Sequence, residues 1–173
     1  TAMAVNKKLA KVGVLVGVCD SFVANRMYYA YTRQAHFSLE EGALPQQVDK
    51  AIQDFGFPMG PFATGDLAGV DVGWRIRKQR AAQRAALGLP PDPRRYSPIA
   101  DRIAEMGRYG QKTSQGWYRY EKGQRAPMPD PVIEELIRDV SAEKGYQRRS
   151  FTDQEIVERC MIPLVNEGAK ILE

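Results

Sequence analysis

The chain has few of the residues that would tie it to cross-links, metals or membranes. Its two cysteines, Cys19 and Cys160, lie far apart without metal-ligand spacing, which favours reduced thiols over a disulfide and predicts no metal site. No apolar run approaches the ~18 residues that a membrane span needs. The sequence does not open on a basic segment followed by an apolar stretch. We therefore expect neither a membrane span nor secretion.

The composition is that of an ordinary globular unit, or of one domain with a fragment of another: 173 residues, 43% hydrophobic and 27% charged. The sequence begins at Thr1, and residues 1–11 resemble the tail of a helix, which suggests a piece of something longer. A basic cluster between Arg75 and Arg84 is compatible with an anionic partner. Lysine and arginine (25) barely outnumber the acidic residues (21), however, and the cluster has no interleaved aromatics, which favours a solvated helix face over a nucleic-acid site.

The N-terminal part predicts a strand followed by a long helix. The apolar run Val12 to Val18 indicates a short buried strand, after which Asp20 or Ser21 supplies an N-cap oxygen. The helix spans about Phe22 to Glu41 and ends before a glycine. One of its faces should be core, formed by Ala24, Tyr28, Tyr31, Ala35 and Leu39.

Helix punctuation divides the rest of the chain. Pro45 opens a helix that closes at Gly56 and buries Val48, Ile52 and Phe55. The expected later elements are a helical region to Leu87 interrupted near Gly65 and Gly69, a helix from Ser97-Pro98 to Gly107, a loop with a short extended piece over 110–120, a helix from Asp130-Pro131 to Lys144, and a final helix with a Thr152/Glu155 capping box and a Phe151/Ile156 staple.

The final helix faintly repeats the first long one. Aligning residues 22–40 with 155–173 matches Val23 with Ile156 and Arg26 with Arg159. This register predicts that the two helices are duplicates, with Glu158 in the position of Asn25.

Four motifs in order carry a family resemblance that covers nearly the whole chain: Cys19–Arg26, Gly56–Phe62, Asp66–Asp71, and Gly110–Thr113 with Gly116–Tyr118. Together they resemble the C-terminal portion of 3-hydroxyacyl-CoA dehydrogenases. The block Asp71–Lys78 and the start of a second copy after Phe151 look most like the multifunctional fatty-acid β-oxidation proteins, in which an enoyl-CoA hydratase part precedes the dehydrogenase.

The resemblance implies a mainly α fold, a helical C-terminal dehydrogenase domain of the 6-phosphogluconate-dehydrogenase C-terminal-like type. It divides the chain into the end of a Rossmann NAD domain, with its last helix and strand (1–18), a first helical domain (19–125), a connecting helix and linker (126–150) and the first helix of a truncated second copy (151–173). The partners that it implies are an acyl-CoA substrate, the remaining domains of a parent chain and a second copy in a homodimer.

Two residues inherit roles from the resemblance. The family's asparagine at Asn25 contacts the reacting part of the acyl-CoA near a catalytic histidine, and its lysine at Lys112 contacts NAD. Both roles suit the chemistry, because an amide donates to a developing oxyanion and an ammonium approaches an anionic cofactor. Outside these motifs, Asn25 would be read as an ordinary capping or polar helix residue.

The chain also departs from the family pattern. Ser21 and Ser114 stand where the family usually has glycine, so a positive φ at either would cost of the order of 1 kcal/mol. The family's catalytic histidine motif and a Gly-x-Gly-x-x-Gly fingerprint are both missing. The sole histidine, His36, is eleven residues from Asn25, roughly 16 Å along a helix, which is too far to share one reacting carbon, so we expect a structural role.

The resulting hypothesis is a fragment of an enzyme that oxidises L-3-hydroxyacyl-CoA to 3-ketoacyl-CoA with NAD, and that is close to inactive alone. The alternatives are part of a single-function short-chain 3-hydroxybutyryl-CoA dehydrogenase, or a non-catalytic helical interaction module. The expected compartment is the bacterial cytoplasm, or the peroxisome if the source is eukaryotic.

Overall fold

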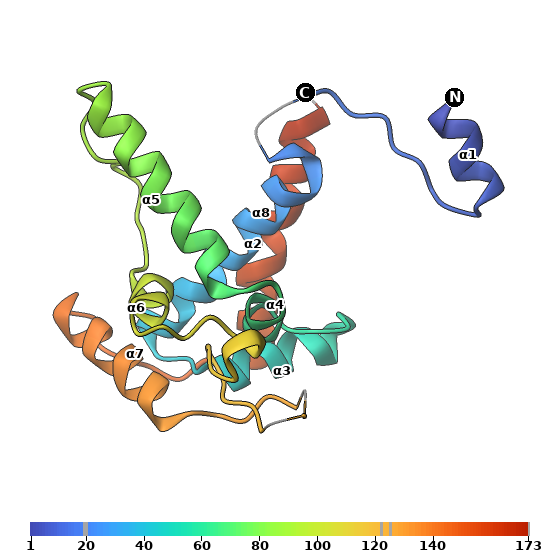
Figure 1. The fold of residues 1–173 in the computed structure, drawn as a ribbon. Coiled ribbons are helices and arrows are strands. Elements are labelled where there is room, and N and C mark those ends of the chain that lie inside the picture. Colours follow the sequence, from blue (N-terminus) through green and yellow to red (C-terminus); the bar gives the residue numbers. More distant parts are fainter. Residues whose placement is uncertain (19–20, 122, 125, 173) are drawn as a thin grey trace.

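The chain is mainly helical in a computed structural model that describes residues 1–18, 21–121, 123–124 and 126–172 (Figure 1). Asp20, one of the two expected N-cap residues, lies outside this part, as does Cys19. The elements in chain order are α1 (Ala2–Lys8), α2 (Phe22–Glu41), α3 (Pro45–Phe55), α4 (Pro61–Ala68), α5 (Val70–Ala86), α6 (Ile99–Glu105), the 3-10 turn η1 (Gln111–Thr113), α7 (Pro131–Glu143) and α8 (Asp153–Leu172).

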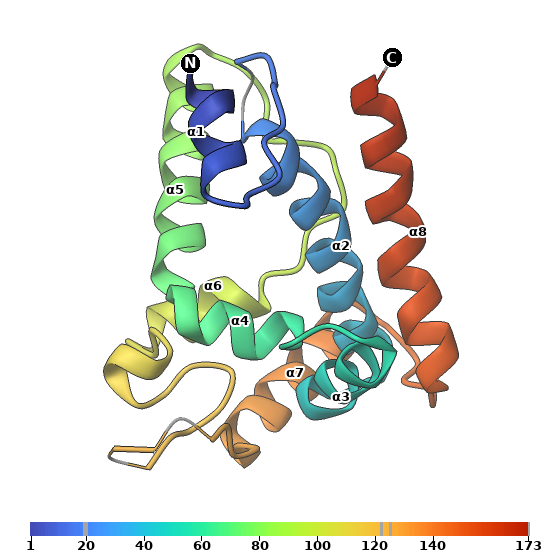
Figure 2. The ribbon, with the colours of Figure 1, turned by 90° about the vertical axis from the view of Figure 1, so that its right-hand side faces the viewer.

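The two longest helices, α2 and α8, lie side by side and antiparallel (Figures 1 and 2). An ion pair joins them at each end. Near the start of α2, Arg26 Nη2 lies 2.7 Å from Glu167 Oε1. Near its end, Arg159 Nη1 lies 2.6 Å from Glu41 Oε2. The two helices predicted to be duplicates are therefore packed directly on each other.

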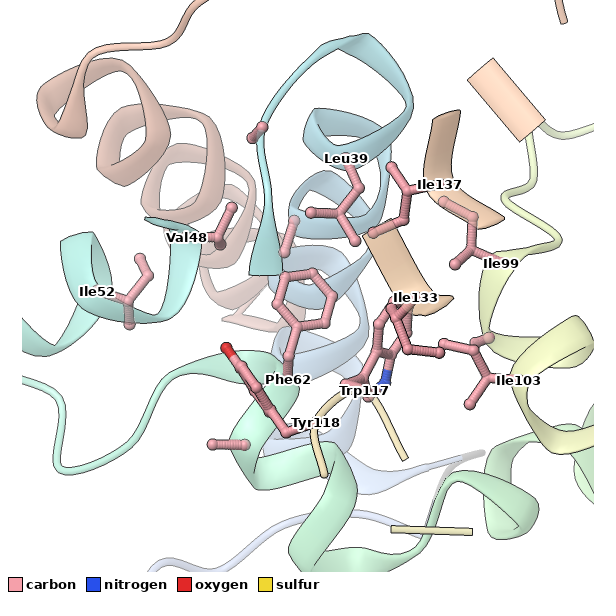
Figure 3. Packing of buried hydrophobic residues seen from close by; sticks show 14 of the residues in the cluster. Leu39, Val48, Ile52, Phe62, Ile99, Ile103, Trp117, Tyr118, Ile133 and Ile137 are labelled. Carbon is pink, nitrogen blue, oxygen red and sulfur yellow. The ribbon is translucent and has the colours of Figure 1, made fainter. Parts of the chain in front are cut away.

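The core lies where the C-terminal part of α2 meets α3, α4, α6, α7 and the start of α8 (Figure 3). Isoleucines dominate its helical walls, while the rings of Phe62 and Trp117 pack near its middle at 4.6 Å between centroids, tilted by 51°. By contrast, α5 buries only Val70 and Asp71 and projects from the body (Figure 1). The buried apolar contacts of α2 are thus made by its C-terminal part. Its N-terminal part is more exposed and is available for a site.

The capping signals near the C-terminus act as expected, with one difference. The Asp130 side chain accepts from the Val132 N–H at 3.1 Å and caps α7. Thr152 Oγ1 accepts from the Glu155 N–H at 3.2 Å. The carboxylate of Glu155 does not complete the capping box, because it pairs with the Arg149 guanidinium, whose Nη1 donates to Oε2 at 3.0 Å.

The expected strand over 12–18 is wrong. Residues 11–18 have no regular secondary structure, and Val12 and Val18 are 94% and 95% exposed. A strand needs a neighbouring strand to bond its backbone, and nothing in the described chain supplies one here. The preceding helix does form, as α1, set apart from the helical body (Figure 1).

Three smaller expectations also fail. Ser21 adopts a left-handed φ of 66° and makes no side-chain cap. Ala24 and Phe55 are exposed because the ends of α2 and α3 extend past the core. Gly65 does not interrupt its helix; the break falls at Gly69 alone, with a φ of 103°. The 110–120 segment is a turn with isolated antiparallel bridges, as its alternating aromatics predict.

Candidate functional site

Asn25 lies in the first turn of α2 with an exposed side chain. Among the described residues, no hydrogen bond engages its amide. The first four N–H groups of a helix have no intrahelical partner, and they give this end of α2 a partial positive charge. An uncommitted amide beside these donors can hydrogen-bond a carbonyl or alkoxide oxygen that approaches from outside.

Ser21, which was expected to cap α2, has a strained backbone conformation instead. Ser21 and Ser114 have φ values of 66° and 58°, so both serines occupy the left-handed region that suits glycine. The two positions where the family resemblance places glycine are thus positions where the backbone favours it. Ser21 lies just before the turn that carries Asn25, and Ser114 ends the turn that carries Lys112.

Lys112 belongs to η1, and its ammonium pairs with Asp71 at the start of α5. The hydrogen bond from Lys112 is the main reason why the pKa of Asp71 lies below its usual range. Gly69 makes the approach feasible, since a Cβ there would lie 2.9 Å from Asp71 Oδ1 and 3.1 Å from Lys112 Nζ. The Lys112 side chain is 50% exposed, so donors remain for an external ligand.

The structure does not bring Asn25 and Lys112 together. The first turn of α2 and the 111–113 turn are well separated in both views of the ribbon (Figures 1 and 2). They could act on one ligand only if that ligand is extended.

His36 lies at the core end of α2, away from the turn that carries Asn25. Its ring packs 5.6 Å from the Phe62 centroid and 5.2 Å from that of Trp117. Burial, with a smaller contribution from Arg77, lowers the pKa of His36 to about 4. A neutral imidazole among aromatic rings is a packing residue, as the distance along the helix predicts.

Two buried carboxylates, Asp49 and Asp66, were not singled out from the sequence. They bind backbone N–H groups of segments near the core end of α2. Asp49 accepts from the N–H groups of Phe62 and Ala63 at 2.9 and 2.8 Å, which satisfies the start of α4. Asp66 accepts from the N–H groups of Trp117 and Tyr118 at 2.9 and 3.0 Å. Burial raises the pKa of each carboxyl to about 6. The sequence signal that could have indicated this role is Asp49, a charged residue beside the apolar positions of α3 that are spaced for burial.

A charged cluster holds the C-terminal end of α2. Glu40 is 0% exposed and contacts Lys144 Nζ at 2.5 Å and Arg95 Nη2 at 3.2 Å. Ser141 Oγ donates to the Glu40 carbonyl at 2.6 Å, which ties α7 to α2. These contacts orient α2 but lie far from Asn25 along the helix, so their role is structural.

The family model described as 3-hydroxyacyl-CoA dehydrogenase, C-terminal domain, matches residues 22–120. The chain belongs to this family.

Known proteins resemble the chain over its whole length. A zebrafish (Danio rerio) protein named peroxisomal bifunctional enzyme is 50% identical, and the alignment covers 100% of this chain and 25% of that protein. The fatty acid oxidation complex subunit alpha of Acinetobacter baumannii is 35% identical over 100% of this chain and 24% of its own length. The crystal structure of the dehydrogenase part of multifunctional enzyme 1 from C. elegans matches with a TM-score of 0.75 and 34% identity, covering 99% of this chain and 36% of that one.

The chain therefore spans about a quarter of the length of the curated relatives it matches. Within the described residues, no helix combines the length and apolarity needed to cross a membrane.

Proposed function

We propose that this chain supplies the substrate-side helical part of an NAD-dependent 3-hydroxyacyl-CoA dehydrogenase within a multifunctional fatty-acid β-oxidation protein. The parent would convert L-3-hydroxyacyl-CoA to 3-ketoacyl-CoA. The observation that carries the proposal is the exposed, uncommitted amide of Asn25 at the start of α2 in a chain of this family. The names of the relatives favour a multifunctional parent over a single-function short-chain enzyme.

In this proposal Asn25 donates a hydrogen bond to the substrate's C3 oxygen, where negative charge develops as the hydroxyl loses its proton. Because the amide is held by a helix, it needs little reorganisation when that charge appears. His36 does not serve as the base, since its ring packs against Phe62 and Trp117 at the core end of α2, away from Asn25. The base belongs to another part of the parent.

Lys112 is the proposed contact with NAD, which accepts the hydride from C3 when bound. The ammonium fits this role, because its side chain is half exposed and only one of its donors is directed at Asp71. Asp71 also lies 3.3 Å from Arg75 Nη2, so this corner of the fold carries more than one cation. An anionic or hydroxyl-rich cofactor could displace part of this pairing.

The domain division remains a proposal: 1–18 as the end of the NAD domain, 19–125 as the first helical domain, 126–150 as connector and 151–173 as the start of a second copy. The antiparallel packing of α2 on α8 supports a duplication. We also propose that the helical part contributes to dimerisation. The bacterial cytoplasm and the peroxisome are the proposed compartments, and the zebrafish relative's name favours the peroxisome.

The catalytic test uses Asn25→Ala in the full-length parent. Loss of one oxyanion donor should lower kcat by about two orders of magnitude, measured as NADH formation from 3-hydroxybutyryl-CoA. Phe55→Ala, at an exposed position on α3, is the control and should leave kcat unchanged. A normal rate in Asn25→Ala would reduce this residue to a polar position in the first turn.

A second test addresses the chain by itself. It lacks the dinucleotide fingerprint and a histidine placed to act as base, so the isolated polypeptide should show no measurable NADH turnover with acetoacetyl-CoA. Turnover by the isolated chain would refute the proposed division of the active site between this chain and the rest of the parent.

A further inference from the structure

Asp66 is a buried carboxylate that the proposed reaction does not use. It lies in α4 and is 1% exposed. Its Oδ1 accepts a hydrogen bond from the N–H of Trp117 at 2.9 Å, and its Oδ2 accepts from the N–H of Tyr118 at 3.0 Å (Figure 3). The phenol of Tyr120 donates to the same Oδ2 at 2.9 Å. All three donors belong to the segment that follows Lys112 in the chain.

The loop that carries Lys112 closes directly on Asp66. Gly110 and Gln115 form its base, where the Gly110 N–H donates to the Gln115 carbonyl at 2.7 Å. A Cβ on Gly110 would lie 2.7 Å from the Asp66 Cα, and a Cβ on Gly116 would lie 2.6 Å from the Asp66 Cγ. These distances leave no room for a Cβ, so the two glycines allow the contact. Both ends of the loop therefore rest on Asp66, and Lys112 lies two residues from one of them.

The side chain of Lys112 is held separately from the backbone of its loop. Its ammonium pairs with Asp71 at the start of α5. The Val70 N–H donates to the Tyr109 carbonyl at 3.3 Å, which joins the N-terminal side of the loop to the same helix. Asp66 is thus the side chain of α4 that fixes the loop, whereas Asp71 holds the ammonium.

We infer that Asp66 is a positioning residue for cofactor binding: it fixes the backbone of residues 110–116 in the place from which Lys112 contacts NAD. The inference rests on the proposed function of Lys112. A lysine ammonium lies at the end of a flexible four-carbon stem, so its reach to a ligand depends on where the backbone holds its Cα. Ordering a mobile loop on binding would weaken the affinity for NAD, and the contacts of Asp66 remove that cost in advance.

An amide at position 66 cannot reproduce these contacts. An ionised carboxylate only accepts hydrogen bonds, whereas an asparagine side chain has one accepting oxygen and an NH₂ group that donates. In Asp66→Asn the NH₂ group would face either the N–H of Trp117 or the two donors at Oδ2. The loop would lose part of its anchor, while the side chains of Lys112 and Asp71 are unchanged.

The test measures the Kd for NADH in the full-length parent, from the change in NADH fluorescence on binding, with no acyl-CoA present. Asp66→Asn should raise this Kd by about threefold to tenfold, up to the roughly tenfold effect expected for Lys112→Ala. The kcat with 3-hydroxybutyryl-CoA at saturating NAD should stay within about twofold, because the residue acts on cofactor binding. An unchanged Kd in a folded Asp66→Asn parent would overturn the inference.

Asp49→Asn is the matched control. Asp49 is also buried, and it accepts from two backbone N–H groups, those of Phe62 and Ala63, and from the phenol of Tyr118. Its backbone donors belong to the start of α4 and not to the loop. Both variants remove a buried carboxylate, but only Asp66→Asn should raise the Kd for NADH. Equal increases would show that a general loosening of the fold weakens binding, and the inference would fail.

A double variant shows whether Asp66 acts through Lys112. Asp66→Asn should have no further effect on the Kd, within about twofold, in the Lys112→Ala background, because the contact that it positions is already lost. Residues that act independently would multiply their effects instead. Multiplied effects would contradict the inference, since Asp66 would then influence NADH binding by another route.

A milder pair of variants provides the same comparison if Asp66→Asn does not fold. Tyr120→Phe removes one donor to Asp66, and Tyr118→Phe removes one donor to Asp49. Tyr120→Phe should raise the Kd for NADH about twofold to threefold, and Tyr118→Phe should leave it unchanged. The opposite order, or no change in either variant, would refute the inference.

The outcomes separate this inference from the function on which it rests. If Lys112→Ala raises the Kd for NADH while Asp66→Asn leaves it unchanged, the inference fails and the proposed NAD contact stands. If Lys112→Ala itself leaves the Kd unchanged, the proposed NAD contact fails, and the role inferred for Asp66 fails with it.

Discussion

The phenol of Tyr118 donates a hydrogen bond to the carboxylate of Asp49 at 2.9 Å, and both groups are buried. The backbone N–H of Tyr118 donates to Asp66 at 3.0 Å, so this one residue links both buried carboxylates. The pair connects α3 and α4 to the 116–120 segment, which is distant in sequence. It is one of several buried polar ties in the core, beside the bond from the Tyr120 hydroxyl to Asp66.

Tyr118→Phe should therefore destabilise the fold. The substitution removes one of three donors to Asp49 and leaves the buried carboxylate less satisfied, which costs about 1–3 kcal/mol. Chemical denaturation of the chain measures the change. Tyr29→Phe, at an exposed position on α2, is the control and should have no measurable effect. Equal stabilities for both variants would mean that the Asp49 contact contributes nothing net.

The same carboxylate predicts a pH dependence. Burial raises the pKa of Asp49 to about 6 in the folded chain, above the value of about 3.9 for an unfolded chain. The folded state then binds the proton more tightly, so the stabilisation is complete below pH 4 and is lost as the pH rises toward and through 6.

Asp49→Asn isolates this contribution from those of other carboxylates. The difference in unfolding free energy, wild type minus variant, should fall between about pH 4 and pH 6. Denaturation curves at half-unit intervals would measure it. A difference that is constant or rises over this interval would show that the hydrogen bonds from Phe62 and Ala63 outweigh burial and hold the carboxyl ionised.

Much of the helical architecture could be predicted from local signals. The end of α2 and the cap of α7 follow from residues that act on their immediate neighbours, such as Gly42 and Asp130. The strand at 12–18 could not be judged in this way, because a strand depends on a partner that the described chain lacks. Phe55 has helical spacing for burial, yet it stays 56% exposed, with its ring stacked 6.3 Å from that of Phe57.

The candidate site, too, could be predicted from the sequence only in part. Asn25 and Lys112 were predicted from the motifs, and their roles remain predictions. The roles of the buried carboxylates Asp49 and Asp66 were not predicted, because each accepts hydrogen bonds from a segment distant in the sequence, and no local pattern reports that these segments meet.

Removing the buried charge of Glu40 should lower the free energy of unfolding. Glu40→Gln removes the carboxylate that pairs with Lys144, whereas Arg95 keeps Glu41 at 2.9 Å. About 2 kcal/mol of stability should be lost, less than for a fully buried pair because Lys144 is partly exposed. Denaturation provides the measurement. Asp54→Asn breaks the exposed pair with Lys50 and should leave stability unchanged. Equal losses in the two variants would contradict a special role for Glu40.

The proposed contact of Lys112 with NAD can be tested with variants of Lys112 and of its ion-pair partner, Asp71. In the parent, Lys112→Ala should raise the KM for NAD by about tenfold, as expected for a lost charge-assisted hydrogen bond, and change kcat less. Asp71→Asn frees the ammonium from its ion pair and should lower that KM or leave it unchanged. If both variants raise the KM for NAD equally, the ion pair supports the fold and does not contact the cofactor.

The strained serines provide a prediction in the stabilising direction. Ser21 and Ser114 hold left-handed φ values of 66° and 58°, which cost an L-residue about 1 kcal/mol more than glycine. Ser21→Gly and Ser114→Gly should each raise the unfolding free energy by up to about 1 kcal/mol. Ser→Ala at the same positions keeps the Cβ and should not stabilise, which separates backbone relief from loss of the hydroxyl. If glycine stabilises neither position, the surrounding turns already relieve the strain, and the preference for glycine in these motifs has another cause.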